Sequence, residues 1–103
     1  MHEQPSNGQQ FGVAKRINLA LQRGFKAFHE GNLRLAYHFA HNVLVENNNV
    51  SQAHYLIGRI AISTRELNIA LKSLEKAIEI DSTMPEYWAF LAIVHCQCGN
   101  MSK

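Results

Sequence analysis

The sequence repeats itself with a period of 34 residues, and this period limits the folds open to the chain more than any other feature. A shift by one period needs no gap and superimposes identical residues: Gly24 on Gly58, Ala27 on Ala61, Leu33 on Leu67 and Ala36 on Ala70. A repeat of this length is one supersecondary unit, whose apolar face is buried only when like units stack side by side. The period therefore predicts a stacked array.

The spacing of apolar residues predicts that each unit contains two antiparallel helices. The second helix of each unit carries an apolar stripe with helical spacing. The stripe comprises Leu33, Ala36, Tyr37, Ala40, Val43 and Leu44 and, one period later, Leu67, Ala70, Leu71, Leu74, Ala77 and Ile78. Another helical segment precedes each stripe, over 17–30 and 51–64, and a fifth helix is expected over 85–98. Strand-like alternation is nowhere sustained, so the predicted class is all-α.

Small residues recur where the two helices of a unit should cross. Gly24 and Gly58 each cost about 1 kcal/mol in helix propensity, and close packing of the two backbones offsets this cost. Gly31 is expected to end its helix in a left-handed turn, and Arg65 stands at the equivalent position of the second unit. The segment 83–86 has the spacing of a capping box, so a helix should start there.

The pattern resembles the tetratricopeptide repeat family. The resemblance rests on residues at fixed positions of each unit: Trp88, Leu91 and Ala92 in the third, Ile57, Gly58, Ala70 and Ala77 in the second, and Gly24 and Ala36 in the first. The chain departs from the family pattern where Ala20 and His54 replace an aromatic residue, and where Asn48 and Ser82 replace a proline. The resemblance implies five helices stacked as a right-handed α-solenoid.

One domain accounts for nearly the whole chain, because 103 residues bury a single core. We assign the repeat domain to 13–103, with one repeat over 17–50, a second over 51–84 and a partial third over 85–103. The remaining residues, 1–12, are expected to form a flexible N-terminal tail.

Composition argues against several classes of function. Ten basic and eight acidic residues give a net charge of +2, which is small for a nucleic-acid binder. The longest apolar run, from Tyr87 to Val94, has eight residues, whereas a membrane-spanning helix needs about 20. Two cysteines, Cys96 and Cys98, form no disulfide framework, so a cytoplasmic location is expected.

The chain carries no motif that would indicate an enzyme or a cofactor. It has no phosphate-binding glycine loop, no nucleophile elbow and no zinc-protease histidine pair. His95, Cys96 and Cys98 are the only cluster that resembles a metal site, but a helix brings together two of them at most. We expect these three residues to be packing residues, and we expect His38 and His41 to lie on the surface.

The family resemblance implies a concave groove lined by the first helix of each unit. Carried over residue by residue, the groove comprises Asn18, Leu21, Gln22, Phe25, Phe28, His29, Gln52, Tyr55, Arg59 and Ile62. Its wall also includes Leu56, Ser63, Glu86, Ala89, Phe90, Ile93, Cys96 and Gln97. Such a groove would bind a protein or peptide partner through apolar anchors, and Arg59 could pair with a carboxylate or a carbonyl. Alternatively, its aromatic residues pack against a following helix of the same protein. The lysines and asparagines with which some relatives hold the C-terminal carboxylate of chaperones are missing.

The fifth helix is apolar all round, and such a helix belongs inside a structure. Its exposed face is expected to include Trp88, Phe90, Leu91 and Val94. Three explanations stay open: further repeats of a longer chain, a homo-oligomer, or an apolar cap. The leading prediction is a non-catalytic interaction scaffold. The alternative is an accessory repeat module of a larger enzyme, for example of the sulfotransferase or glycosyltransferase type.

Overall fold

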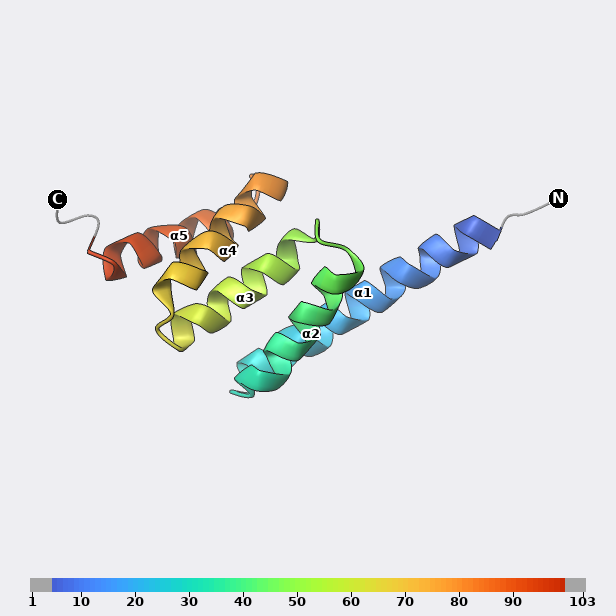
Figure 1. Ribbon diagram of the computed structural model, residues 1–103, viewed down its shortest axis with the longest axis horizontal. Coiled ribbons are helices and arrows are strands. Elements are labelled where there is room, and N and C mark those ends of the chain that lie inside the picture. Colours follow the sequence, from blue (N-terminus) through green and yellow to red (C-terminus); the bar gives the residue numbers. More distant parts are fainter. Residues whose placement is uncertain (1–4, 100–103) are drawn as a thin grey trace.

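The structure, a computed structural model, describes residues 5–99, and all the regular structure in this part of the chain is helical (Figure 1). Its five helices are α1 (Pro5–His29), α2 (Leu33–Glu46), α3 (Ser51–Ser63), α4 (Leu67–Ile80) and α5 (Pro85–Gln97). The predicted all-α class and the predicted number of helices are confirmed.

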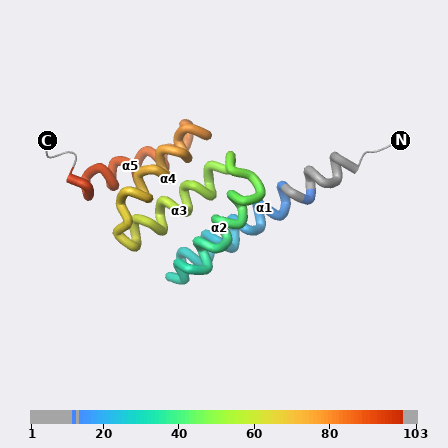
Figure 2. Tube along the Cα trace, viewed as in Figure 1, coloured from blue at the N-terminus to red at the C-terminus, as the bar shows by residue number. Residues whose placement is uncertain are grey.

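The 34-residue period of the sequence is also the period of the structure. Both ends of α4 lie 34 residues after the ends of α2, and both ends of α5 lie 34 residues after those of α3. Each helix packs on the next one in the chain, and α3 also touches α1 and α5. The trace therefore advances in one direction along an elongated molecule of 63 × 27 × 19 Å (Figure 2). This packing is consistent with a helical repeat.

Two glycines allow the paired helices to cross closely, as predicted. A Cβ atom at Gly24 would lie 2.8 Å from Cδ2 of Leu56 and 3.2 Å from Cβ of Phe39. A Cβ atom at Gly58 would lie 3.0 Å from Cγ of Leu74. Separations this short cause overlap, so a larger residue would push the helices apart.

The turn that follows the first helix of each unit has the same backbone conformation in all three units. Gly31, Arg65 and Gly99 have positive φ angles of 85°, 64° and 78°. In the first two turns, the amide after this residue donates to the carbonyl five positions earlier at 2.8 Å, which is the Schellman pattern. Arg65 adopts this conformation at a cost of about 1 kcal/mol, because its Cβ crowds the backbone.

Helix α1 begins earlier than the sequence analysis predicts. It starts at Pro5 and so includes residues that we assigned to the tail over 1–12. A helix that has already formed gains one hydrogen bond for each added residue. Proline is well suited to the first turn, where its missing N–H has no partner to lose.

The predicted capping box at the start of α5 is wrong. The residue before the helix is Met84, which makes no capping hydrogen bond. The hydroxyl of Thr83 instead donates to Oδ1 of Asp81 at 2.6 Å, and the Thr83 amide donates to the same oxygen at 3.0 Å. These bonds hold the pKa of the Asp81 carboxyl below its usual value. In a capping box the Thr83 hydroxyl oxygen would accept from the amide of Glu86, whereas here the hydroxyl is held against the Asp81 carboxylate.

The core follows the apolar stripes of α2 and α4. Its fully buried members on these helices are Ala36, Ala40, Val43, Ala70, Leu74 and Ala77. Tyr37 is the exception, because it lies at the edge of its stripe and is 47% exposed. Its ring stacks on His41 with the centroids 5.8 Å apart.

Candidate functional site

Aromatic rings from α1 and α5 gather around Tyr55 of α3, the central residue of the candidate site. The Tyr55 ring centroid lies 6.0 Å from that of Phe25 on α1. It lies 4.8 Å from that of Tyr87 and 5.9 Å from that of Phe90, both on α5. These are ordinary distances for attractive aromatic pairs. The first helices of all three units therefore contribute to one aromatic cluster.

Arg59 is the cation of this cluster and lies one turn after Tyr55 on α3. Its guanidinium carbon is 4.3 Å from the ring centroid of Phe90, 4.9 Å from that of Phe28 and 5.7 Å from that of Tyr55. Its Nη1 donates a hydrogen bond to the Tyr55 hydroxyl at 3.2 Å. The side chain is partly buried. Within residues 5–99, no carboxylate forms an ion pair with it.

A hollow of about 510 Å³ borders the cluster between α1 and α3. It is lined by Asn18, Leu21, Gln22, Phe25 and Gln52. Leu21 and Phe25 supply its apolar surface, and the amide side chains can donate and accept hydrogen bonds. A hollow of this composition can hold an apolar side chain of a ligand while the amides bind the ligand backbone.

The structure brings most of the predicted groove residues together on α1 and α3. Leu21 and Tyr55 are buried; Phe25, Phe28, Arg59 and Ile62 are partly buried; Asn18, Gln22, His29 and Gln52 are exposed. Leu56 does not belong to the wall, because it is fully buried against Gly24. That position faces the helix crossing instead of the solvent.

Sequence reasoning missed the part that Tyr87 plays in the site. Its ring packs on Tyr55, and its hydroxyl hydrogen-bonds the buried Ser51 hydroxyl at 3.0 Å. Burial raises the pKa of the Tyr87 phenol above its usual value, and the bond from Ser51 partly offsets this rise. The 34-residue period does not predict this role for Tyr87, because the equivalent residues of the earlier units, Leu19 and Ala53, are not aromatic.

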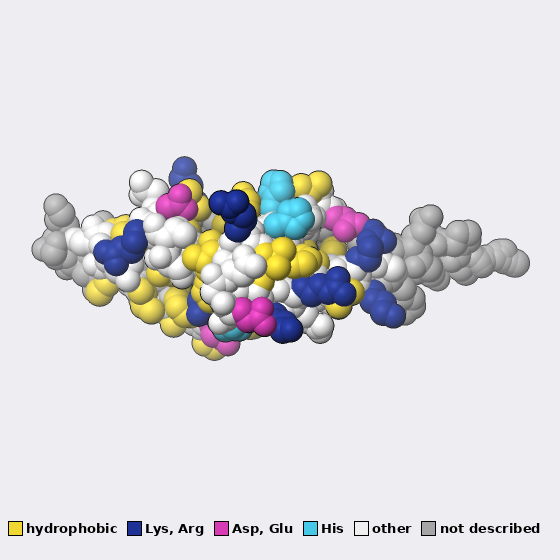
Figure 3. Space-filling model, turned by 90° about the horizontal axis from the view of Figure 1, so that it is seen from below, with side chains coloured by type: hydrophobic (Ala, Val, Ile, Leu, Met, Phe, Trp, Pro, Cys, Tyr) yellow, Lys and Arg dark blue, Asp and Glu magenta, His cyan; other side chains and the backbone are white. Residues whose placement is uncertain are grey.

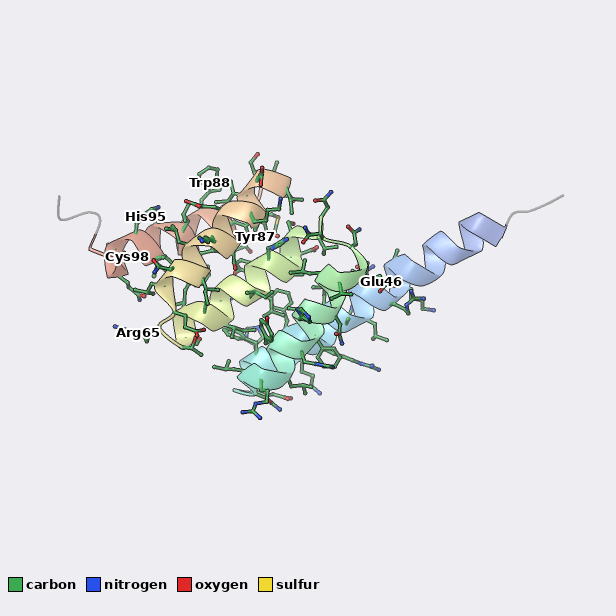
Figure 4. All side chains as sticks on the ribbon, viewed as in Figure 1. Glu46, Arg65, Tyr87, Trp88, His95 and Cys98 are labelled. Atoms are coloured by element: carbon green, nitrogen blue, oxygen red, sulfur yellow. The ribbon has the colours of Figure 1, made fainter. Side chains whose placement is uncertain are left out.

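The four residues predicted to form an exposed face of α5 do not share one side of the helix. Val94 is fully buried within the chain, so its assignment to that face is wrong. Phe90 points toward Arg59, and Leu91 is partly buried. Trp88 is 50% exposed, and Figure 4 shows it pointing away from the other helices, whereas Tyr87 points toward α3. At about 100° per residue, Trp88 lies about 120° around the helix from Val94, so one can be exposed while the other faces the core.

One stripe of α5 lies open although its equivalents are covered. Ala92 occupies the position of Gly24 and Gly58, both of which are buried beneath the second helix of their unit. Ala92 is exposed, as are Trp88 and Ile93. An apolar stripe of this kind has the character of a helix-packing surface.

The predicted surface histidines and the cysteines bring no metal ligands together. His38 hydrogen-bonds Asn42 at 3.2 Å, and both His38 and His41 are exposed, as predicted. Cys96 and Cys98 are free and exposed, so the packing role assigned to them is wrong. In the described part of the chain, no three His, Cys, Asp or Glu side chains are placed to hold a metal ion.

Charged side chains are dispersed on the surface. Figure 3 shows lysine and arginine side chains spread over one face, with acidic and hydrophobic side chains between them. Several are paired: Arg16 binds Glu46, and Lys26 lies 3.7 Å from Glu30. Such exposed pairs add little stability.

Comparison with known proteins gives no relative from which a role for the site could be inferred. Among the helices of residues 5–99, none has both the length and the apolar character needed to cross a bilayer. No protein-family model matches this chain, and no curated protein matches it either.

Proposed function

We propose that this chain is a non-catalytic interaction scaffold of the tetratricopeptide type, a right-handed solenoid that binds a peptide or helix in the groove between α1, α3 and α5. The observation that carries the proposal is the convergence of aromatic rings from α1 and α5 on Tyr55 of α3. Aromatic residues are enriched among the anchors that dominate binding energy at protein interfaces. Free, exposed thiols at Cys96 and Cys98 support a reducing, cytoplasmic location.

The hollow beside the cluster supports a peptide as the ligand. Its apolar floor is formed by Leu21 and Phe25, and amide side chains surround it. An extended segment needs pockets for its side chains and polar partners for its backbone. The hollow offers both, and it adjoins the aromatic cluster through Phe25, so one segment could contact the two together.

Selection from a phage library of random dodecapeptides on the immobilised chain tests this proposal. We expect enriched peptides to lose at least about tenfold in affinity when Gln22 and Gln52 are both changed to Glu, because the two charges border an apolar hollow. The matched control changes Asn42 and Asn68 to Glu. These residues are exposed on α2 and α4, and their replacement adds the same charge away from the groove.

Circular dichroism of both double variants establishes that the helices are intact. The proposal fails if the library yields no enriched peptide, or if the enriched peptides bind the groove variant as well as they bind the control.

The second candidate is an accessory repeat module of a larger enzyme, in which a further repeat would pack on the open stripe of α5. Ala92 lies exposed where the equivalent glycines are covered by a helix. A further repeat could cover it in the same way. The test is a synthetic helix with the sequence of α4, the partner of α3: it should bind the wild-type chain and not a Trp88→Glu variant. Equal binding to both would show that a further repeat does not pack on this stripe.

A further inference from the structure

We infer that the partner segment carries an internal aspartate or glutamate side chain, and that Arg59 binds its carboxylate. The inference rests on the proposed function and specifies the chemistry of its ligand. The residue that carries it is a partly buried arginine in an aromatic surrounding, with no acidic partner among residues 5–99.

The hydrogen-bonding capacity of Arg59 is largely unused. A guanidinium has five N–H donors, and the described structure uses one of them, in the bond to the Tyr55 hydroxyl. Ring faces attract the cation but accept no conventional hydrogen bonds. A partly buried charge is favourable when it is paired, so the free donors of Arg59 are suited to an anionic ligand.

A carboxylate suits this surrounding better than a phosphate does. Its two oxygens can accept parallel bonds from the planar guanidinium, and its single negative charge matches the single positive charge of Arg59. A phosphate carries more charge, and the rings of Phe28, Tyr55 and Phe90 around Arg59 offer nothing to neutralise the excess.

The position of Arg59 favours a side-chain carboxylate over a chain terminus. Arg59 lies on α3, the middle one of the three helices that form the cluster. The hollow at Gln52 lies two turns before it, about 10 Å along the helix axis, and Ile62 follows one turn later. A segment that passes along α3 would therefore extend on both sides of Arg59 and bring an internal residue to it.

The peptides selected for groove binding provide the test. They are displayed without a free C-terminus, so any acidic residue common to them belongs to a side chain. We expect a common Asp or Glu flanked by apolar residues. On the wild-type chain, changing that Glu to Gln in the synthetic peptide should weaken binding at least about tenfold, as expected for a hydrogen-bonded charge.

Two variants of Arg59 complete the experiment. Arg59→Met keeps the length and the apolar contacts of the side chain, so it should bind the Glu and Gln peptides equally. Arg59→Lys restores the charge and should recover part of the preference for the Glu peptide. The peptide substitution on the wild-type chain is decisive by itself if either variant fails to fold.

The outcomes separate this inference from the proposed function. Groove-dependent peptides that tolerate Glu→Gln would overturn the inference and leave the groove function standing. Groove-dependent peptides that share no aspartate or glutamate would likewise overturn the inference. A library without groove-dependent peptides would overturn both proposals.

Discussion

Replacing Arg65 with glycine should relieve backbone strain in the turn after α3, although it also removes a charged side chain. Arg65 has a φ angle of 64° in a turn where the first and third units have glycine. The left-handed conformation costs an ordinary residue about 1 to 2 kcal/mol, whereas glycine adopts it freely. The greater freedom of glycine in the unfolded chain offsets about 0.4 to 1 kcal/mol of this gain. The backbone contribution is therefore a gain of about 1 kcal/mol.

Charge must be separated from backbone conformation in this comparison. A cation near the end of α3 also interacts favourably with the helix dipole, by about 0.3 to 1 kcal/mol. Both Arg65→Ala and Arg65→Gly remove that charge, so the difference between the two variants reports the backbone alone. We expect the glycine variant to be more stable than the alanine variant by about 1 kcal/mol, which is about 4 to 8 °C in melting temperature for a domain of this size.

Lys72 is the matched control, because it is an exposed lysine within α4. There the order should be reversed: Lys72→Gly should be less stable than Lys72→Ala by about 1 kcal/mol, since glycine is a poor helix former. Thermal and urea unfolding followed by circular dichroism measure both pairs. The same order at both positions, with alanine the more stable, would show that Arg65 is not left-handed and that the turn is not shared among the units.

Three further outcomes are expected. Gly24→Ala should lower the melting temperature, because the added Cβ would lie 2.8 Å from Leu56. Gly12→Ala should raise the melting temperature, because no atom lies closer than 4.0 Å to the added Cβ and alanine is the better helix former. Equal shifts in the two variants would contradict the close crossing at Gly24. Burial raises the pKa of the Tyr87 phenol above 10, so the unfolded chain ionises first and the folded state should lose stability as the pH rises above about 10. Tyr87→Phe should make the free energy of unfolding, measured by urea titration, less dependent on pH in this range. An unchanged pH dependence would show that Tyr87 is not its source. Trp88→Glu should abolish any concentration-dependent sedimentation of the wild-type chain, because Trp88 is half exposed on the open side of α5; association that persists in the variant would place the contact elsewhere.

The features that sequence analysis predicted well are local or repeated. Helix α2 and its equivalent α4 were predicted from apolar spacing, and the left-handed turn at Gly31 was predicted from its place after the first helix. Positions that depend on the end of a helix or on competition between partners were predicted less well. The start of α1 and the hydroxyl of Thr83 are examples, because nearby groups offered alternatives of similar energy.

The candidate site was only partly predictable. Alignment to a repeat pattern placed Phe25, Tyr55 and Arg59 on one wall, and the structure brings them together. The alignment did not predict that Tyr87 completes the cluster or that Val94 is buried. Both depend on how α5 is rotated against α3 and α4. A helix that is apolar all round contains no internal indication of the side that will face the core.

The sequence by itself therefore determined the helices, their order and the 34-residue translation that relates them, because hydrogen bonding, propensity and apolar spacing act over a few residues. Only the tertiary structure decided that Arg59 lies among rings from three helices and that Trp88 stays exposed. Both depend on contacts between residues about 30 positions apart in the chain. Such contacts form only when whole helices pack, and the angle and rotation of that packing set which side chains meet.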